Sequence, residues 1–459
     1  MKNWLIIGAG VSGKAAALYL RARGHGVRIS EKRWLEPAER DGLVDVGVDV
    51  RDAGHDVNHL DAIDAVVVSP GVATNHFLVR SALQRGLAIV PEIELALDEV
   101  RGPLLAVTGT NGKSTTCAMI AHLLEGLGQR PILAGNFGIP LSHFLIDGPT
   151  HAPVVLEVSS YQLEFCDRLR SRSAAVLNLD ADHLRRHVTL DNYLASKWKL
   201  LEQCESGGTV ILPAELDDRA ARLRLMPPRA RKLTVGIGSS DADVVLHQRQ
   251  VRERGGSQLA DLGVLPWSEP HNDYNAMVAM LLTASIVPES LSVLAHLLRD
   301  FRGLPHRCQP IGELRHRPVI DDSKATNVAA TLAAVMSFEE PVTLLVGGEP
   351  KGDAWEALLE ARGTIDHVVA FGEAAPLIER TLCGRVEVTC YASLRDCLED
   401  AERWARREGG PILFSPGCSS FDEFADFEDR GRFFQRWLSS RQDAGGREVV
   451  ANGASPFGR

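Results

Sequence analysis

The residues with the clearest potential for chemistry follow a short apolar run, in the stretch VTGTNGKST. Glycines in such a turn let backbone amides face phosphate oxygens, the lysine supplies a cation, and a hydroxyl can ligate Mg²⁺. The stretch departs from the broad phosphate-loop pattern at Val107, which stands where the first glycine belongs. A plain glycine turn with an exposed lysine is the alternative. The predicted nucleoside triphosphate site consists of Gly109, Thr110, Asn111, Gly112, Lys113, Ser114 and Thr115.

Potential metal ligands follow two further apolar runs of the same region. Glu157 ends the run VVLE, and a carboxylate buried in an apolar strand is costly unless it is paired or holds a metal. The next run leads into NLDADHLRRH, which contains His183. Open α/β sheets bind ligands at their carboxyl edge, where both residues are expected. We predict that Glu157 and His183 bind Mg²⁺; a salt bridge and a hydrogen-bonded loop histidine are the alternatives.

Two lysines lie on the helix predicted for NYLASKWKLLE. Lys197 and Lys199 are two positions apart and therefore point in nearly opposite directions, so at most one can face the site. A desolvated, neutral lysine can add CO₂ to form a carbamate, which is an anion able to approach Mg²⁺. A solvated surface lysine is the alternative for either position.

The stretch GAGVSG near the start of the chain has the spacing of a dinucleotide-binding turn. It follows an apolar run and precedes a helical pattern, and Glu31 ends the next run. Such a turn lets a diphosphate approach the backbone at the start of a helix. By itself, the pattern is compatible with NAD or FAD binding and with a simple tight turn.

Three loops in the C-terminal third carry lysines and hydroxyls after apolar runs: DDSKATN, GGEPKGD and SPGCSSFDEFADFEDRG. Because parallel strands end at one edge of a sheet, these loops can converge on one small ligand. Lys324 and Lys351, with neighbouring hydroxyls, suit a dicarboxylate.

The elements that must position these residues alternate short apolar runs with helical patterns, which is typical of parallel α/β folds. A chain of 459 residues exceeds one ordinary core. We predict a Rossmann-like N-terminal domain over 1–98, a central phosphate-loop ATPase domain over 99–303, a C-terminal doubly wound α/β domain over 304–441, and a disordered tail over 442–459. The polar stretch RQVRERGGSQLADLG is interpreted as a surface excursion.

Composition excludes several classes of protein. The formal net charge is −10 without a long basic run, which argues against a nucleic-acid partner. The eight cysteines are scattered without a CxxC pair, which argues against a zinc site and a disulfide framework. No apolar stretch reaches the roughly 18 to 20 residues of a membrane span. We therefore expect a cytosolic protein. We also predict that it is a monomer.

These motifs together resemble the Mur ligases, ATP-dependent amide-forming enzymes of peptidoglycan assembly and hence of cell-wall biogenesis, cell shape and cell division. TGTNGKST, EVSSYQLE, ADH, ASK, HNDYN, LPHR and DDSKATN occur in the family's order, and the resemblance covers about residues 1 to 440. It implies ATP and two Mg²⁺ ions as cofactors. Within the family, the chain is most similar to members that join D-glutamate to UDP-N-acetylmuramoyl-L-alanine through an acyl phosphate.

The resemblance also implies residue roles. Catalysis and metal binding would rest on Lys113, Glu157, His183 and a carbamylated Lys197, with Ser114 as a further metal ligand. The UDP-substrate site would comprise Val11, Ser12, Glu31, Lys32, Arg33, Gly71 and Asn136. Further nucleotide contacts would be Asn272, Asn275, Arg307 and Asp322. The amino-acid site would comprise Lys324, Thr326, Lys351, Ser420 and Phe427.

Two positions depart from the family's pattern, namely Arg185 in place of an acidic residue and Pro350 in place of a glycine. Other functions therefore stay open. The same ligase mechanism could use L-glutamate or another amino acid. More remote alternatives are a non-catalytic UDP-sugar-binding protein and an NAD-dependent oxidoreductase.

Overall fold

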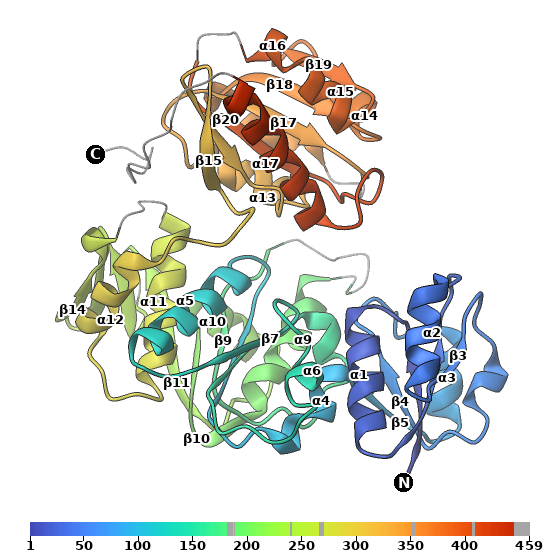
Figure 1. Cartoon of the computed structure of the whole chain (residues 1–459). Coiled ribbons are helices and arrows are strands. Elements are labelled where there is room, and N and C mark those ends of the chain that lie inside the picture. Colours follow the sequence, from blue (N-terminus) through green and yellow to red (C-terminus); the bar gives the residue numbers. More distant parts are fainter. Residues whose placement is uncertain are drawn as a thin grey trace. The chain divides into compact units, whose positions relative to one another are not determined.

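A computed structural model of the chain shows three β-sheets with flanking helices, which follow one another along the chain (Figure 1). It describes residues 1–180, 187, 189–238, 241–265, 270–350, 354–405 and 409–444. The chain divides into two compact units, with the boundary between Phe301 and Arg302. The first unit holds the first two sheets, and the second unit holds the third. The predicted α/β fold class is confirmed.

The N-terminal sheet has five parallel strands in the order β3-β2-β1-β4-β5. Alternate residues of its strands face two apolar clusters: Ile6 and Val67 lie in one, and Leu5 and Val66 lie in the other. Both faces are thus covered, as a parallel sheet requires. Its strands are β1 (Asn3–Ile7), β2 (Gly26–Ser30), β3 (Asp49–Arg51), β4 (Ala65–Val68) and β5 (Ala88–Pro91), and its helices are α1 (Val11–Ala22), α2 (Pro37–Asp45), η1 (Val57–Leu60) and α3 (Phe77–Gln84).

The central sheet has nine strands in the order β14-β13-β12-β11-β10-β9-β6-β8-β7. In this order, every pair of neighbouring strands from β12 to β7 is parallel. Strands β12, β13 and β14 form an antiparallel meander at the other end of the sheet. The strands of the sheet are β6 (Leu104–Thr108), β7 (Ile132–Gly135), β8 (Val154–Glu157), β9 (Ser171–Val176), β10 (Cys204–Pro213), β11 (Arg231–Ile237), β12 (Val244–His247), β13 (Gln250–Glu253) and β14 (Gln258–Asp261). The interpretation of RQVRERGGSQLADLG as a surface excursion is therefore wrong, because this stretch contains β13 and β14.

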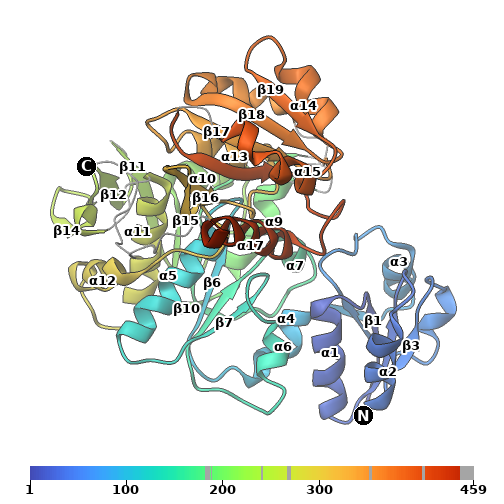
Figure 2. The same cartoon turned by 45° about the horizontal axis from the view of Figure 1, so that its top comes forward.

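Helices α5 and α11 pack against each other in the central region, and both views show them side by side (Figure 2). The first turn of α5 follows the phosphate loop, so α11 is placed to reach that loop. The helices of the region are α4 (Glu92–Leu95), η2 (Leu97–Glu99), α5 (Lys113–Gly126), α6 (Leu141–Phe144), α7 (Ser160–Leu163), α9 (Leu190–Glu202), α10 (Ala214–Arg222), η3 (Leu262–Val264), α11 (Pro270–Ala284), α12 (Leu291–Leu297) and η4 (Leu298–Asp300).

The second unit contains a six-stranded sheet in the order β15-β16-β20-β17-β18-β19, with only the β15–β16 pair antiparallel. Helix α17 packs on β15 and β16 and buries Phe434 and Leu438 on one face of the sheet. The strands are β15 (Gln309–Leu314), β16 (Arg317–Asp321), β17 (Val342–Gly347), β18 (Ile365–Phe371), β19 (Val388–Tyr391) and β20 (Ile412–Gly417). The helices are α13 (Val328–Val335), η5 (Trp355–Thr364), α14 (Ala375–Leu382), α15 (Leu394–Glu399), α16 (Ala401–Trp404) and α17 (Phe427–Ala444).

Two sequence expectations concern the end of the chain and the membrane. Helix α17 continues to Ala444, so a disordered tail does not begin at 442, and 445–459 lie outside the described residues. Within the described parts of the chain, no helix combines the length and apolar character needed to cross a membrane.

Candidate active site

The stretch Gly109–Gly112 joins β6 to α5 and forms the predicted phosphate loop. Lys113 begins α5, and its Nζ donates hydrogen bonds to the carbonyls of Gly109 (2.9 Å) and Thr110 (2.7 Å). Oδ1 of Asn178 accepts hydrogen bonds from the backbone amides of Thr110 and Asn111, both at 2.9 Å. The loop is therefore held at its turn by a side chain from the end of β9.

Glu157 ends β8 and is only 2% exposed. Its Oε2 accepts a hydrogen bond of 2.6 Å from the Ser114 hydroxyl, and its Oε1 accepts one of 2.7 Å from Nδ2 of Asn136. No described lysine or arginine forms an ion pair with this carboxylate, so the salt-bridge alternative finds no support. A buried carboxylate that is satisfied by neutral donors keeps its charge available for a cation, and its oxygens, like the serine hydroxyl, suit Mg²⁺.

The two lysines of α9 point to different places, as their spacing requires. Lys197 is 1% exposed; its Nζ donates a 2.7 Å hydrogen bond to the carbonyl of Gly109 and lies 4.3 Å from the ring centroid of Tyr193. Nζ of Lys199 instead donates to the carbonyl of Glu164 at 3.1 Å. Lys197 is therefore the lysine of this pair that reaches the phosphate loop.

Helix α11 contributes Asn275 to the same loop. Gly112 has a φ of +80°, and a Cβ built on it would lie 2.4 Å from Oδ1 of Asn275. Only glycine fits this position, because any side chain would meet the amide and would strain the backbone. Asn275 is buried, whereas the predicted contact Asn272 is half-buried one turn earlier. The ion pair between Arg249 and Asp273, at 2.9 Å, fixes this end of α11.

The structure does not test part of the predicted metal site. His183 and Arg185 lie outside the described residues. Among the residues that are described, no group of three or more His, Cys, Asp and Glu side chains is placed to hold a metal ion. The structure therefore brings together Ser114, Glu157 and Lys197 at the loop and does not test the second metal ligand.

The N-terminal turn GAGVSG is compact. A Cβ on Gly13 would lie 2.0 Å from the carbonyl oxygen of Gly8, so α1 can start this close to β1 only with glycine at that position. Glu31 accepts hydrogen bonds from the amides of Ala9 (2.6 Å), Lys32 (2.7 Å) and Arg33 (3.1 Å). Burial opposes ionisation of Glu31, but these bonds outweigh it and hold the pKa of its carboxyl below the usual value. Its carboxylate is thus engaged with the turn itself.

The other predicted UDP-substrate residues lie around this turn, with one exception. Val11 is 74% exposed at the start of α1, next to the half-buried Ser12. Ser69 Oγ donates a 3.4 Å hydrogen bond to the carbonyl of Gly8, which draws the loop of Gly71 towards the turn. Asn136 instead contacts Glu157 in the central region.

The predicted amino-acid site gathers at the carboxyl ends of β16 and β20. Nζ of Lys324 lies 3.9 Å from the ring centroid of Phe427, and Ser420 is 2% exposed. Thr326 is half-buried two residues after Lys324. Lys351 and its loop lie outside the described residues, although Pro350 is described. The structure thus places Lys324 and Phe427 together and does not test the second lysine.

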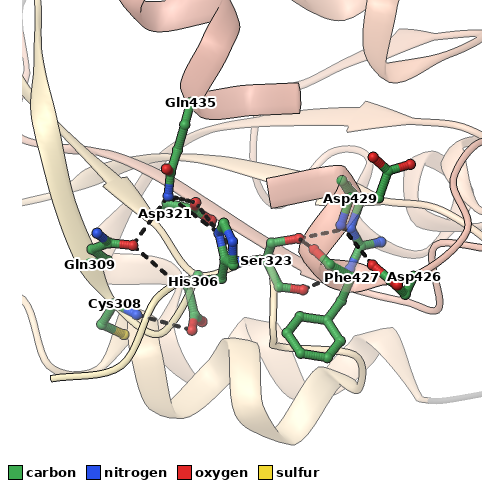
Figure 3. Close-up of polar contacts among 11 residues, drawn as sticks. His306, Cys308, Gln309, Asp321, Ser323, Asp426, Phe427, Asp429 and Gln435 are labelled. Atoms are coloured by element: carbon green, nitrogen blue, oxygen red, sulfur yellow. Dashed lines mark hydrogen bonds and ion pairs between the residues drawn. The ribbon is translucent and has the colours of Figure 1, made fainter. Parts of the chain in front are cut away.

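Sequence reasoning missed Arg430, which supports this region. Arg430 is 1% exposed; its Nε donates to the Ser323 hydroxyl at 3.1 Å and its Nη2 donates to the Ser323 carbonyl at 2.8 Å. The Ser323 hydroxyl in turn donates to the carbonyl of Phe427 at 2.8 Å (Figure 3). Burial lowers the pKa of Arg430 to about 10, so it stays charged at neutral pH. Arg430 lies in the stretch SPGCSSFDEFADFEDRG, but nothing in that stretch indicates that its arginine is buried.

A second missed cluster involves His306, which is buried in the stretch LPHR. Its Nδ1 lies 2.7 Å from Oδ2 of Asp321, and Nε2 of Gln435 donates to the same oxygen at 2.8 Å (Figure 3). The neighbouring Asp322 accepts hydrogen bonds from the Ser415 hydroxyl (2.7 Å) and the Cys308 amide (3.2 Å). Burial raises the pKa of Asp322 to about 7.

Arg307 and Asp322 were both predicted to contact nucleotide. Arg307 is half-buried beside His306, and its charge acts on Asp322 by lowering that residue's pKa against the larger effect of burial. Both oxygens of Asp322 are already hydrogen-bonded within the second unit. The nucleotide role of both residues stays a prediction.

The phosphate loop lies at the carboxyl edge of a mostly parallel sheet, and α/β regions precede and follow it in the chain. This arrangement defines an α/β protein of the phosphate-loop nucleotide-binding class. Comparison with known families narrows this class. The model of the Mur ligase middle domain matches residues 107–283, and that of the Mur ligase MurD-like N-terminal domain matches residues 2–91. The chain belongs to the Mur ligase family, and it is accordingly an ATP-dependent ligase.

Curated relatives cover almost the whole chain. The UDP-N-acetylmuramoylalanine--D-glutamate ligase of Syntrophus aciditrophicus is 33% identical over 446 residues, which are 95% of this chain and 97% of that protein. The ligase of the same name from Pelotomaculum thermopropionicum is 34% identical over 454 residues, covering 96% and 98%. The family resemblance seen in the sequence is confirmed.

Solved structures share the fold at lower identity. UDP-N-acetylmuramate-alanine ligase MurC from Thermotoga maritima superposes with a TM-score of 0.61 at 20% identity, covering 97% of this chain and 100% of that one. MurF ligase from Thermotoga maritima in complex with ADP gives a TM-score of 0.60 at 16% identity, covering 91% and 96%. These neighbours support the succession of α/β sheets described above.

Proposed function

We propose that the chain joins glutamate to UDP-N-acetylmuramoyl-L-alanine, with ATP cleaved to ADP and phosphate, and that the glutamate is the D enantiomer. The printed names of relatives that are about a third identical over nearly the full chain support the substrates. The arrangement of Glu157, Ser114 and Lys113 at one phosphate loop is the observation that carries the chemistry.

The first chemical step is phosphoryl transfer. A carboxylate oxygen of the alanyl group attacks the γ-phosphorus, the bond to the β,γ-bridging oxygen breaks, and ADP leaves with an acyl phosphate formed. Catalysis of such transfer rests on positioning and charge neutralisation. Lys113 stands at the start of α5 with an ammonium that can leave the loop carbonyls for the β- and γ-phosphates. Loop amides and the N-terminus of α5 add partial positive charge.

Mg²⁺ fits the residues present, because Ser114 and Glu157 place a hydroxyl and a buried carboxylate at the loop. When bound there, Mg²⁺ would neutralise phosphate charge. We propose Glu157 and Ser114 for a first ion, and His183 with a carbamylated Lys197 for a second. Burial of an ammonium is costly, which favours the neutral amine of Lys197. The neutral amine can add CO₂ and lose a proton to give the carbamate.

The second chemical step forms the amide. The neutral amine of glutamate attacks the acyl carbon, the tetrahedral intermediate loses a proton from nitrogen, and phosphate leaves. We propose that Lys324, Lys351, Thr326 and Ser420 hold the two glutamate carboxylates, and that Phe427 packs on the carbon chain. The 3.9 Å approach of Lys324 to the Phe427 ring supports a shared pocket.

We also propose that the reaction takes place in the cytoplasm by a monomer. None of the eight cysteines, all of which lie among the described residues, forms a disulfide bond, which fits a reducing compartment. The residues proposed for the UDP-substrate site are unchanged: Val11, Ser12, Glu31, Lys32, Arg33, Gly71 and Asn136. Asn136 also donates a hydrogen bond to Glu157.

The decisive experiment measures phosphate release from ATP in the presence of UDP-N-acetylmuramoyl-L-alanine and either D- or L-glutamate. Release with D-glutamate alone is expected. Release with L-glutamate alone would keep the ligase mechanism and overturn the stereochemical assignment, since two lysines and hydroxyls can hold the carboxylates of either enantiomer. Lys113→Ala serves as the inactive control and should still bind the UDP substrate.

A further inference from the structure

A polar cleft of about 570 Å³ lies at the amino edge of the central sheet. Its walls come from the segment that leads into β6, from the residues before and at the start of β9, from the start of β10 and from the two residues after α11. Strands β6, β9 and β10 are neighbours and run in parallel. The phosphate loop follows the carboxyl end of β6, so the cleft lies at the opposite edge of the sheet from the proposed nucleotide site.

The charged lining of this cleft is mostly basic. It consists of Arg101, Arg168, Arg170 and Arg172 with Asp98 and Glu205. Arg168 is already paired, because its Nε lies 3.0 Å from Oε1 of Glu94 and its Nη1 lies 3.6 Å from Oδ2 of Asp98. The other three arginines form no ion pair with any described residue. Three arginines without an ion pair therefore line the cleft together with Glu205, in a chain whose formal net charge is −10.

A cleft lined mainly by charges of one sign attracts counter-ions, because these charges add to one local potential. Arg101, Arg170 and Arg172 are exposed and can turn towards a ligand. Planar guanidinium groups bind phosphate oxygens in pairs of hydrogen bonds. The chemistry of the lining therefore favours an anion with several phosphate oxygens.

The size and remaining walls of the cleft indicate more than a bare phosphate. Small-molecule sites typically measure about 300 to 1,000 Å³, and this cleft falls within that range. Leu97, Val100 and Ile286 contribute apolar surface next to the arginines. A ligand with a phosphate-rich end and an organic end would match both parts of the lining.

We propose that this cleft binds an organic phosphate with at least two phosphate groups, at a site separate from the substrate sites of the ligase. Arg101, Arg170 and Arg172 hold the phosphates, and the organic part lies against Leu97 and Ile286. Arg101 belongs to the segment that connects the N-terminal sheet to β6, whereas Arg170 and Arg172 belong to the β9 region. A bound ligand would therefore tie the connecting segment to the edge of the central sheet.

Calorimetric titration with inorganic pyrophosphate tests this proposal in the full chain. The Lys113→Ala background weakens the contribution of the phosphate loop. In that background, pyrophosphate binding should persist, and adding Arg101→Ala and Arg170→Ala together should weaken it at least tenfold. Arg130→Ala, an exposed arginine outside the cleft, should leave binding unchanged. Thermal unfolding midpoints check that the variants fold, so the measurement needs no enzymatic turnover and is independent of the proposed function.

Each other outcome overturns the proposal. If pyrophosphate does not bind in the Lys113→Ala background, or binds equally well without Arg101 and Arg170, the cleft is a solvated surface. If poly-L-glutamate binds through these arginines and pyrophosphate does not, the partner is an acidic chain and not an organic phosphate. Titrations with ADP and UDP measure the contribution of the organic part. Because both nucleotides also have proposed sites elsewhere in the ligase, only the binding that is lost with Arg101→Ala and Arg170→Ala is compared with that of pyrophosphate, and it should be tighter for at least one nucleotide. If neither nucleotide binds more tightly, the assignment of the ligand's organic part fails.

Discussion

The hydroxyl of Ser114 donates a 2.6 Å hydrogen bond to Oε2 of Glu157, which joins the first turn of α5 to the end of β8. The bond places two oxygen atoms that suit a hard cation, one from a hydroxyl and one from a carboxylate, directly beside the phosphate loop. Because Glu157 is buried and its described partners are neutral, its negative charge is not compensated by a nearby ion pair. A divalent cation would supply that compensation.

Removing the charge of Glu157 while keeping the shape of its side chain should therefore impair ATP turnover. For Glu157→Gln, we expect roughly a hundredfold loss of phosphate release at moderate Mg²⁺, with partial recovery as Mg²⁺ is raised. The control is Glu215→Gln, which neutralises an exposed carboxylate in the same region. Phosphate release measured across a Mg²⁺ series checks the prediction, and equal activity of the two variants would exclude Glu157 as a ligand.

The two lysines of α9 should behave differently. Lys197 contacts the phosphate-loop carbonyl of Gly109, whereas Lys199 contacts the carbonyl of Glu164. Lys197→Ala should lower turnover roughly a hundredfold, since loss of a group that supports a metal commonly costs that much. Short carboxylates such as formate should restore part of the activity by replacing the carbamate.

Lys199→Ala is the matched control for this prediction. It removes the same side chain from the other side of the helix and should keep turnover within about threefold of the wild type, as surface substitutions usually do. Formate should have no effect on it. The opposite pattern, with loss and rescue at Lys199, would mean that Lys197 has only a structural role.

Glu92 should make the stability of the chain depend on pH. This carboxyl is 2% exposed; its Oε1 accepts a 2.7 Å hydrogen bond from the Ser142 amide, while Oε2 has no partner among the described residues. Burial raises its pKa from 4.5 to about 7. Between these values the folded chain binds a proton that the unfolded chain has lost, so stability falls as pH rises.

Glu92→Gln removes this titration. From pH 4 to pH 8, the free energy of unfolding of the variant should rise relative to that of the wild type by up to about 3 kcal/mol, because each pKa unit corresponds to about 1.4 kcal/mol. Urea unfolding at a series of pH values measures the difference. The exposed Glu289→Gln variant should follow the wild type at every pH. A constant difference for Glu92→Gln would show that the pKa of this carboxyl is the same in the folded and the unfolded chain.

The strands of the N-terminal and C-terminal sheets and the position of the site were largely predictable from sequence, whereas most strands of the central sheet were not. Long apolar runs such as VTLLVGG give β17, because both faces of a parallel sheet are buried. The strands that were not predicted include the short Asp49–Arg51 and the meander of β13 and β14. These segments are short or polar, and they become strands by pairing with neighbours at a sheet edge. Local composition does not encode that pairing.

Residues that act directly after a strand were predictable, whereas residues that support them were not. Lys113 and Glu157 follow apolar runs, so their place at the carboxyl edge follows from the fold class. Asn178 lies in the stretch NLDADHLRRH, but its hydrogen bonds to the loop amides depend on the pairing of β9 with β6. Arg430 depends on contacts with Ser323, 107 residues earlier in the chain.

Arg430 should control glutamate binding through the residues it positions. It contacts both the hydroxyl and the carbonyl of Ser323, and that hydroxyl bonds to the carbonyl of Phe427, whose ring contacts Lys324. Arg430→Lys keeps the charge but loses the planar fork that binds both groups at once. We expect the KM for glutamate to rise about tenfold, which corresponds to about 1.4 kcal/mol, with little change in the KM for the UDP substrate.

The control for Arg430 is Arg432→Lys, on the same helix and 55% exposed at its side chain. It should leave both KM values unchanged. Loss of a buried arginine's hydrogen bonds can also destabilise the fold, so the unfolding midpoint of each variant is measured alongside the kinetics. A selective rise in the KM for glutamate identifies Arg430 as a positioning residue, because a general loss of folded protein lowers the apparent kcat without separating the two KM values. Equal KM values in Arg430→Lys and the wild type would instead confine its role to stability.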